Sequence, residues 1–74
     1  MKLVKMYKDD FGNMASIEKG KILPYKDSPI KEMAYRLTLC AMYDSFIYYV
    51  SIYESMEKAL EKLSEFSCNS WKEV

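Results

Sequence analysis

The order of hydrophobic and polar residues predicts several strands followed by one helix. In 55–67, apolar residues recur at the spacing of one helix face, and Ser55 is a suitable N-cap. Glutamates and lysines three and four residues apart fill the other face, as on a solvent-exposed side. We therefore expect an amphipathic helix over 55–67. Its apolar stripe consists of Met56, Ala59, Leu60, Leu63 and Phe66.

Two segments before this helix have the composition of β-strands. In 46–53, β-branched and aromatic residues fill nearly every position, and 35–42 alternates large apolar residues with polar or small ones. Asp44-Ser45 lies between them and suits a two-residue turn. A second interpretation remains open, because 29–43 also fits a helical stripe that starts at a proline. We favour a short helical turn at 29–33 that runs into a strand.

A two-residue turn would fix which side chains of the hairpin face each other. It pairs Leu39 with Val50 and Leu37 with Ile52, so that one apolar face is expected to lie beneath the helix. The opposite face then carries aromatic, methionine and arginine side chains, which are enriched in protein interfaces. That face is a candidate partner-binding surface, unless the N-terminal segment covers it. Its members are Arg36, Met42, Ile47, Tyr49 and Tyr53.

The first third of the chain has weaker patterns. Residues 2–8 predict a strand, 9–13 form a turn-rich stretch, and 14–23 predict a second strand that is broken or bulged at Gly20. Residues 24–28 are expected to be a linker. The fold class is therefore α+β: a small antiparallel β-sheet in β-β-β-β-α order, with one C-terminal amphipathic helix packed on its apolar face.

The length of the chain limits the size of its hydrophobic core. A chain of 74 residues allows a single domain, 1–74, and buries only about 60% of the surface that its unfolded form exposes. Such a thin core makes a second subunit a natural supplement. Trp71 is expected to fold back on this core or on the sheet rim, because a lone exposed indole is costly in a small domain.

Composition argues against an enzyme and against a cofactor. The chain has no histidine, only two glycines, and no phosphate-binding or metalloprotease motif. The triplet at 10–12 and the Ser-x-x-Lys string at 16–19 lack the companion motifs that would give them catalytic meaning. The carboxylates at Glu57, Glu61 and Glu65 suit a solvated helix face rather than a metal site. We therefore expect no catalytic residue, no metal and no cofactor.

A cytoplasmic location is the expectation from the remaining features. Acidic residues interrupt the N-terminus before a secretory hydrophobic region could form. The longest uncharged stretch, 45–53, has nine residues, against about 20 for a membrane-spanning helix. Cys40 and Cys68 follow no metal or redox spacing, so we expect free thiols, with a disulfide between them as the other option.

Charge and aromatic content frame the functional hypotheses. Eleven basic residues balance eleven acidic ones, although residues 1–31 are net basic and 32–74 net acidic. In size and composition the chain resembles the small inhibitors of phages and mobile elements, such as anti-CRISPR proteins, and no motif is shared. We predict a non-enzymatic protein-binding module, in which a homodimer joined by edge strands or sheet faces is one option. The alternative is a single-stranded nucleic-acid binder that stacks bases on the tyrosine face. Lysines around Tyr49 and Tyr53 would favour this nucleic-acid alternative.

Overall fold

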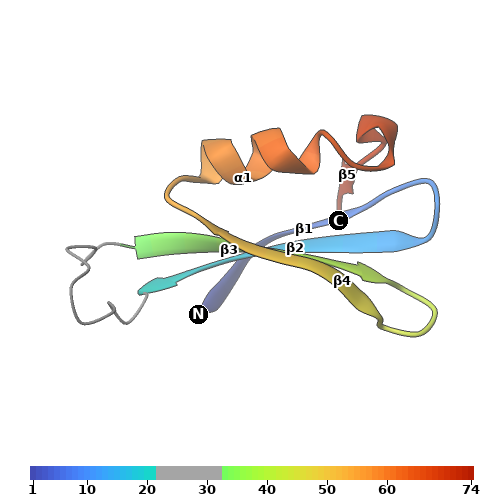
Figure 1. Ribbon diagram of the computed structural model, residues 1–74. Helices are drawn as coiled ribbons and strands as arrows, with labels where there is room; N and C mark the ends of the chain where they lie inside the picture. Colours follow the sequence, from blue (N-terminus) through green and yellow to red (C-terminus); the bar gives the residue numbers. More distant parts are fainter. Residues whose placement is uncertain (22–32) are drawn as a thin grey trace.

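The protein folds as a five-stranded antiparallel sheet with one helix on one face (Figure 1). The computed structural model describes residues 1–21 and 33–74. The strands lie in the order β4-β3-β2-β1-β5, and the α+β class predicted from the sequence is confirmed. The elements are β1 Lys2–Lys8, β2 Asn13–Lys21, β3 Met33–Ala41, β4 Ile47–Tyr53, α1 Met56–Leu63, the 3₁₀ turn η1 Ser67–Asn69, and β5 Lys72–Glu73.

Several predicted boundaries shift. The strand β3 already begins at Met33, so the alternative helix over 29–43 is wrong from that residue onward. The linker 24–28, the end of the second strand at 22–23 and the helical turn before Met33 lie outside the described residues. Gly20 pairs regularly with Ala34, and the bulge lies instead in β1, between Leu3 and Lys5.

The helix is shorter than predicted but begins at the predicted cap. The Ser55 hydroxyl accepts a hydrogen bond from the backbone N–H of Lys58 at 3.2 Å, which satisfies one of the free donors of the first turn. The helix ends at Leu63 rather than at residue 67, and the chain returns through η1. Trp71 then packs on the core as expected, and its indole N–H donates to the carbonyl of Leu63 at 3.0 Å.

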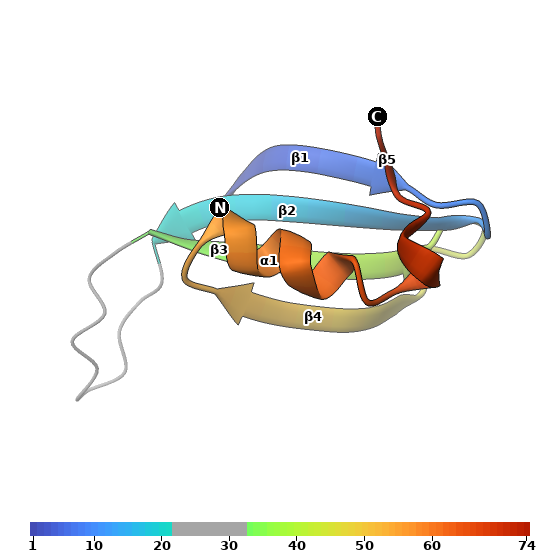
Figure 2. The same ribbon diagram turned by 90° about the horizontal axis from the view of Figure 1, so that it is seen from above.

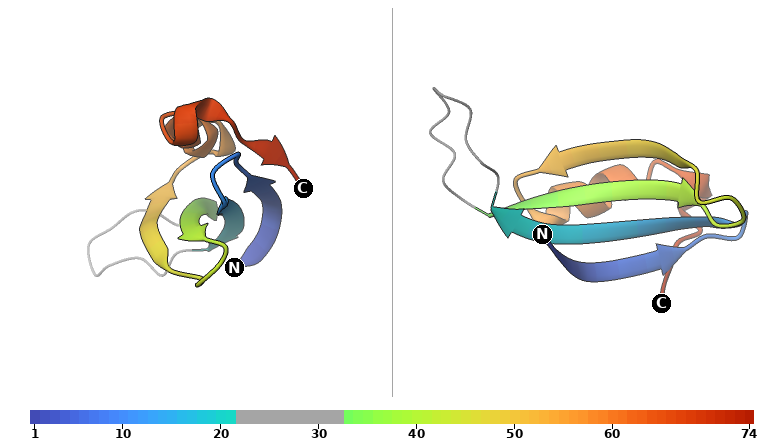
Figure 3. Two further views of the ribbon diagram at one scale, coloured as in Figure 1. Left: turned by 90° about the vertical axis from the view of Figure 1, so that its right-hand side faces the viewer. Right: turned by 90° about the horizontal axis from the view of Figure 1, so that it is seen from below.

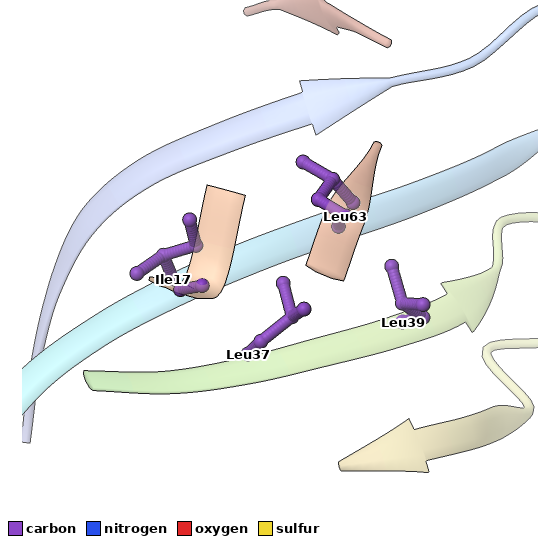
Figure 4. Packing of buried hydrophobic residues seen from close by; sticks show 6 residues of the cluster. Ile17, Leu37, Leu39 and Leu63 are labelled. Carbon is purple, nitrogen blue, oxygen red and sulfur yellow. The ribbon is translucent and has the colours of Figure 1, made fainter. Parts of the chain in front are cut away.

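The core lies between the sheet and α1. Figure 4 shows Ile17 of β2 and Leu37 and Leu39 of β3 gathered beneath Leu63 of α1. Ala15 and Ala59 complete the buried cluster, and half-buried aromatic side chains surround it. Because four of the eight buried hydrophobic residues in the described part of the chain are alanines, the core is small. The half-buried hydrophobic residues packed against it are Tyr7, Tyr35, Tyr49, Tyr53, Met56, Leu60, Phe66 and Trp71.

The hairpin register predicted from the sequence is wrong by one residue. The loop between β3 and β4 spans five residues, 42–46, not two. Its ends are joined by a hydrogen bond from the Ala41 N–H to the Phe46 carbonyl at 2.9 Å, and the Asp44 carboxylate accepts from the Phe46 N–H at 3.0 Å. As a result Leu39 pairs with Tyr49 rather than with Val50.

A one-residue slip exchanges the two faces of β4. Ser51 pairs with Leu37 and Val50 with Thr38, so Tyr49, Ser51 and Tyr53 face α1. Val50 and Ile52 face away from it. A bulge in the pairing near Leu39 and Cys40 then brings Ile47 opposite Cys40, on the face away from the helix.

The sheet is curled and covered on one side only. Seen from above, α1 lies along β3 and β4, while β1 and β5 lie at the far edge (Figure 2). Seen end on, the strands curve so that α1 lies across the open side of the curl (Figure 3). Among residues 1–21 and 33–74, no helix covers the other face of the sheet, which we name the outer face.

The C-terminal segment pairs with the β1 edge of the sheet. The strand β5 pairs with Tyr7 and Lys8 of β1, and the Val74 N–H donates to the Met6 carbonyl at 2.9 Å. Nearby, the Asp9 carboxylate accepts hydrogen bonds from Asn13, from the Phe11 N–H and from the Ser67 hydroxyl. Asp9 thus ties the first turn of the sheet to η1.

The corrected register predicts a large loss of stability for one substitution in the hairpin and a small loss for another. Leu39→Ala removes a fully buried side chain and is expected to lower the free energy of unfolding by about 2–5 kcal/mol. Val50→Ala changes an exposed position and is expected to cost less than about 1 kcal/mol. Urea denaturation of both variants measures the difference. Equal losses would show that Val50 is buried and the register is wrong.

Asp9 predicts a pH dependence of stability. Its partial burial raises the pKa, but hydrogen bonds from Ser67, Asn13 and the Phe11 N–H outweigh this and hold the pKa below the usual 3.8. A carboxylate with a lowered folded pKa stabilises the fold above its unfolded pKa, and the stabilisation is lost as the pH falls through the folded pKa. The stability difference between the wild type and Asp9→Asn is therefore expected to shrink below about pH 3.8.

Thermal unfolding at a series of pH values between 2 and 7 tests this expectation. The matched control is Asp10→Asn, because that neighbouring carboxylate is exposed and accepts none of the bonds made by Asp9. A stability gap for Asp9→Asn that stays constant with pH would contradict the assignment.

Candidate functional site

The strongest candidate site is a row of exposed apolar side chains on the outer face of β4. Ile47, Val50 and Ile52 are 55%, 53% and 45% exposed, which is unusual for β-branched residues in a strand. Tyr48 lies in the same row, and Met42 extends it at the loop end. We name these five residues the outer strip. Contiguous exposed apolar surface of this kind marks interaction sites in small proteins.

Two of the predicted site residues belong to the outer strip and a third borders it. Met42 and Ile47 are members. Arg36, opposite Ile52, lies on the same face and forms an ion pair with Glu18, whose carboxylate oxygen lies 3.0 Å from Nε and 2.7 Å from a terminal guanidinium nitrogen. This pair neutralises the middle of the outer face. The row of β4 is therefore bordered by a neutral polar surface and not by free charge.

The other two predicted residues lie on the opposite face. Tyr49 and Tyr53 were expected away from the helix, and that placement is wrong because of the register shift. Both rings pack against the core, and the Tyr49 and Phe66 ring centroids are 5.1 Å apart. The Tyr49 and Tyr53 hydroxyls form a hydrogen bond of 2.5 Å. Partial burial raises the pKa of Tyr53 above its usual value of 10, and the hydrogen bond with Tyr49 raises it further. The Tyr53 hydroxyl is therefore neutral at physiological pH.

A hollow lies between Tyr53 of β4 and the flank of α1 on the β4 side. It is lined by Tyr53 and by two lysines and two glutamates of the helix and its end, namely Lys58, Glu61, Lys62 and Glu65. Lys58 pairs with Glu54, and Lys62 lies 3.4 Å from Glu65. The charges around Tyr53 are therefore mixed in sign and largely paired.

Exposed aromatic residues also gather at the loop end of the sheet. Tyr43 and Phe46 belong to the loop 42–46, and Phe11 to the turn between β1 and β2. The two loops are adjacent, because the Met42 N–H donates to the Gly12 carbonyl at 3.0 Å. Because Met42 belongs both to the outer strip and to the loop 42–46, exposed apolar residues extend from the strip to this end of the sheet.

Within the described part of the chain, no group of three or more cysteine or carboxylate side chains could hold a metal ion. Cys40 and Cys68 are free thiols, one half-buried and one exposed. No helix among the described residues is both long enough and apolar enough to cross a bilayer. Comparison with protein-family models, curated proteins and solved structures finds no match to this chain.

Sequence reasoning missed Tyr48, Val50 and Ile52 as surface residues. The segment 46–53 has apolar residues at almost every position, so alternation could not indicate which side faces the core. The only available signal was the hydroxyl of tyrosine. A tyrosine at the rim of a small core can bury its ring and keep its hydroxyl hydrogen-bonded, which valine and isoleucine cannot do.

The placement of Tyr49 predicts a structural role for its ring. Tyr49→Ala removes the contact with Phe66 and is expected to lower the free energy of unfolding by about 2–4 kcal/mol. Tyr49→Phe keeps the ring, loses one hydroxyl pair, and is expected to cost about 1 kcal/mol. Chemical denaturation of both variants provides the measurement. Wild-type stability of Tyr49→Ala would place this ring outside the core.

Proposed function

We propose that the chain is a non-enzymatic protein-binding module that contacts its partner through the outer strip and acts by occluding the bound surface. The observation that carries the proposal is the exposure of the β-branched residues of β4, on a sheet whose other face already has a helix. Placing such residues in water forgoes the stabilisation that their burial would give, about 1.5–3 kcal/mol for each fully buried side chain. Contact with a partner recovers part of it.

The chemistry of the strip suits a protein better than a nucleic acid. Its five side chains carry no charge, and Arg36, which lies opposite Ile52, is paired with Glu18. Nucleic-acid affinity depends mainly on positive charge along the binding surface. The described lysines of the basic N-terminal part lie on β1 and β2, across the sheet from β4, and Lys26 and Lys31 lie outside the described residues.

Two further features belong to the proposal. A location in the cytoplasm is consistent with the free thiols of Cys40 and Cys68. Occlusion of a partner is the mode of action implied by the resemblance, in size and composition, to small inhibitors of phages and mobile elements. The absence of histidine from the sequence supports a function without catalysis.

Introducing charge on the outer strip tests the proposal. Val50→Lys with Ile52→Lys places two cations on the exposed face of β4 and is expected to abolish capture of the partner on immobilised protein, a loss of at least tenfold. The fold is expected to survive because both side chains already contact solvent. The matched control, Leu3→Lys with Val4→Lys, changes equally exposed residues of β1 and should leave capture unchanged.

The same samples separate the two classes of partner. Fluorescence anisotropy with a labelled single-stranded oligonucleotide at two salt concentrations is expected to show no binding by the wild type. Salt-sensitive binding would overturn the proposal in favour of nucleic acid. Undiminished protein capture by the Val50→Lys, Ile52→Lys variant would move the contact surface away from the outer strip.

A further inference from the structure

The outer edge of β4 is an open edge of the sheet. β4 pairs only with β3, and among residues 1–21 and 33–74 no strand lies on its other side (Figures 2 and 3). Its seven residues include no charge, proline or glycine. An uncharged, regular edge strand presents unpaired N–H and C=O groups and invites pairing with another chain, so natural proteins protect such edges or use them.

The opposite edge of the sheet is protected. β5 pairs with Tyr7 and Lys8, and lysines at positions 2, 5 and 8 place charge along β1. Two copies of β1 brought together would bring like charges face to face, which destabilises a strand pair. The two edges therefore differ: one is blocked by pairing and charge, and the other is open and neutral.

We propose that a second copy of the chain occupies the β4 edge, pairing antiparallel with β4 about a two-fold axis at Ser51. This register sets Ser51 opposite its own copy, Tyr49 opposite Tyr53 on the helix side, and Val50 opposite Ile52 on the outer side. Aromatic pairs and β-branched pairs directly across antiparallel strands are favourable. The two sheets become one continuous sheet across the axis.

The direction of α1 on β4 determines how two copies of the helix would meet. β4 leads into α1 through residues 54–55, and the Tyr49 ring lies beside Phe66, beyond the end of the helix. α1 therefore runs antiparallel to β4 (Figure 2). A two-fold axis at Ser51 also sets the two copies of α1 antiparallel to each other.

Charge complementarity supports this arrangement. Lys58, Glu61, Lys62 and Glu65 all line the hollow beside Tyr53 of β4, so the flank of α1 toward the β4 edge carries two cations and two carboxylates. Two antiparallel copies of such a flank can set the lysines of one copy against the glutamates of the other. This favours a second copy of the chain over a partner that carries charge of one sign.

Dimer formation leaves the outer face available. The two outer strips meet at the axis through Val50 and Ile52 and form one apolar patch of twice the extent, on the side away from both helices. The inference does not require a partner protein, and its tests use the pure chain alone. A monomeric protein would therefore leave the proposed binding function standing. Unchanged partner capture by the Val50→Lys, Ile52→Lys variant would likewise leave the dimer standing.

Light scattering coupled to size exclusion provides the first measurement. The wild type is expected to show twice the monomer mass of 8.7 kDa at micromolar concentration. Ser51→Lys and Ser51→Glu each place two like charges on the axis and should raise the dissociation constant at least tenfold. An equimolar mixture of the two variants should restore the dimer, because opposite charges then meet. Val4→Lys, on the β1 edge, should remain dimeric.

A disulfide trap tests the register without adding charge. In a Cys40→Ser, Cys68→Ser background, Ser51→Cys is expected to form a covalent dimer under mild oxidation, and Val4→Cys is not. Circular dichroism of each variant checks that the fold is retained. A monomeric wild type at millimolar concentration would overturn the inference. So would a dimer in which Val4→Cys, rather than Ser51→Cys, becomes cross-linked.

Discussion

The packing of α1 on Ile17, Leu37 and Leu39 determines most other features of this protein. An eight-residue helix is about 12 Å long, whereas the strands beneath it, of seven to nine residues, extend for roughly 23–30 Å. One such helix can cover only one face of the sheet, and only part of that face. The half-buried tyrosines around the core complete the cover, since their rings extend the apolar layer while their hydroxyls reach its rim. The curl of the sheet brings these rings toward the helix (Figure 3).

The same limitation leaves apolar side chains on the outer face. With no second helix among the described residues, the β-branched residues of β4 stay in contact with water, next to an unpaired strand edge. The proposed partner surface and the proposed dimer edge both arise from this one strand. They use different parts of it: side chains that face outward in the first case, and backbone groups together with the charged flank of α1 in the second.

The sequence predicted the helices and strands more readily than it predicted which side chains of β4 face the helix. Helical spacing located α1 and its cap at Ser55, and β-branched and aromatic composition located β3 and β4. The register depended on the loop. Asp44 and Ser45 suited a two-residue turn, but the Asp44 carboxylate instead caps the Phe46 N–H inside a longer loop, and this shifted the pairing by one residue. The two charged residues of β5 gave no strand signal, because their pairing depends on where the helix returns the chain.

The link between the two ends of the sequence has a consequence for how folding proceeds. β1 to β4 are joined in sequence order, so their pairings form between segments that are close along the chain. The hydrogen bonds of Val74 with Met6 and of Ser67 with Asp9 join residues that are 68 and 58 positions apart. Contacts so distant in sequence carry a large loop-closure entropy and slow the folding of small domains. The four-stranded meander can therefore form first, and the β1 edge stays unpaired until the segment around β5 docks on it.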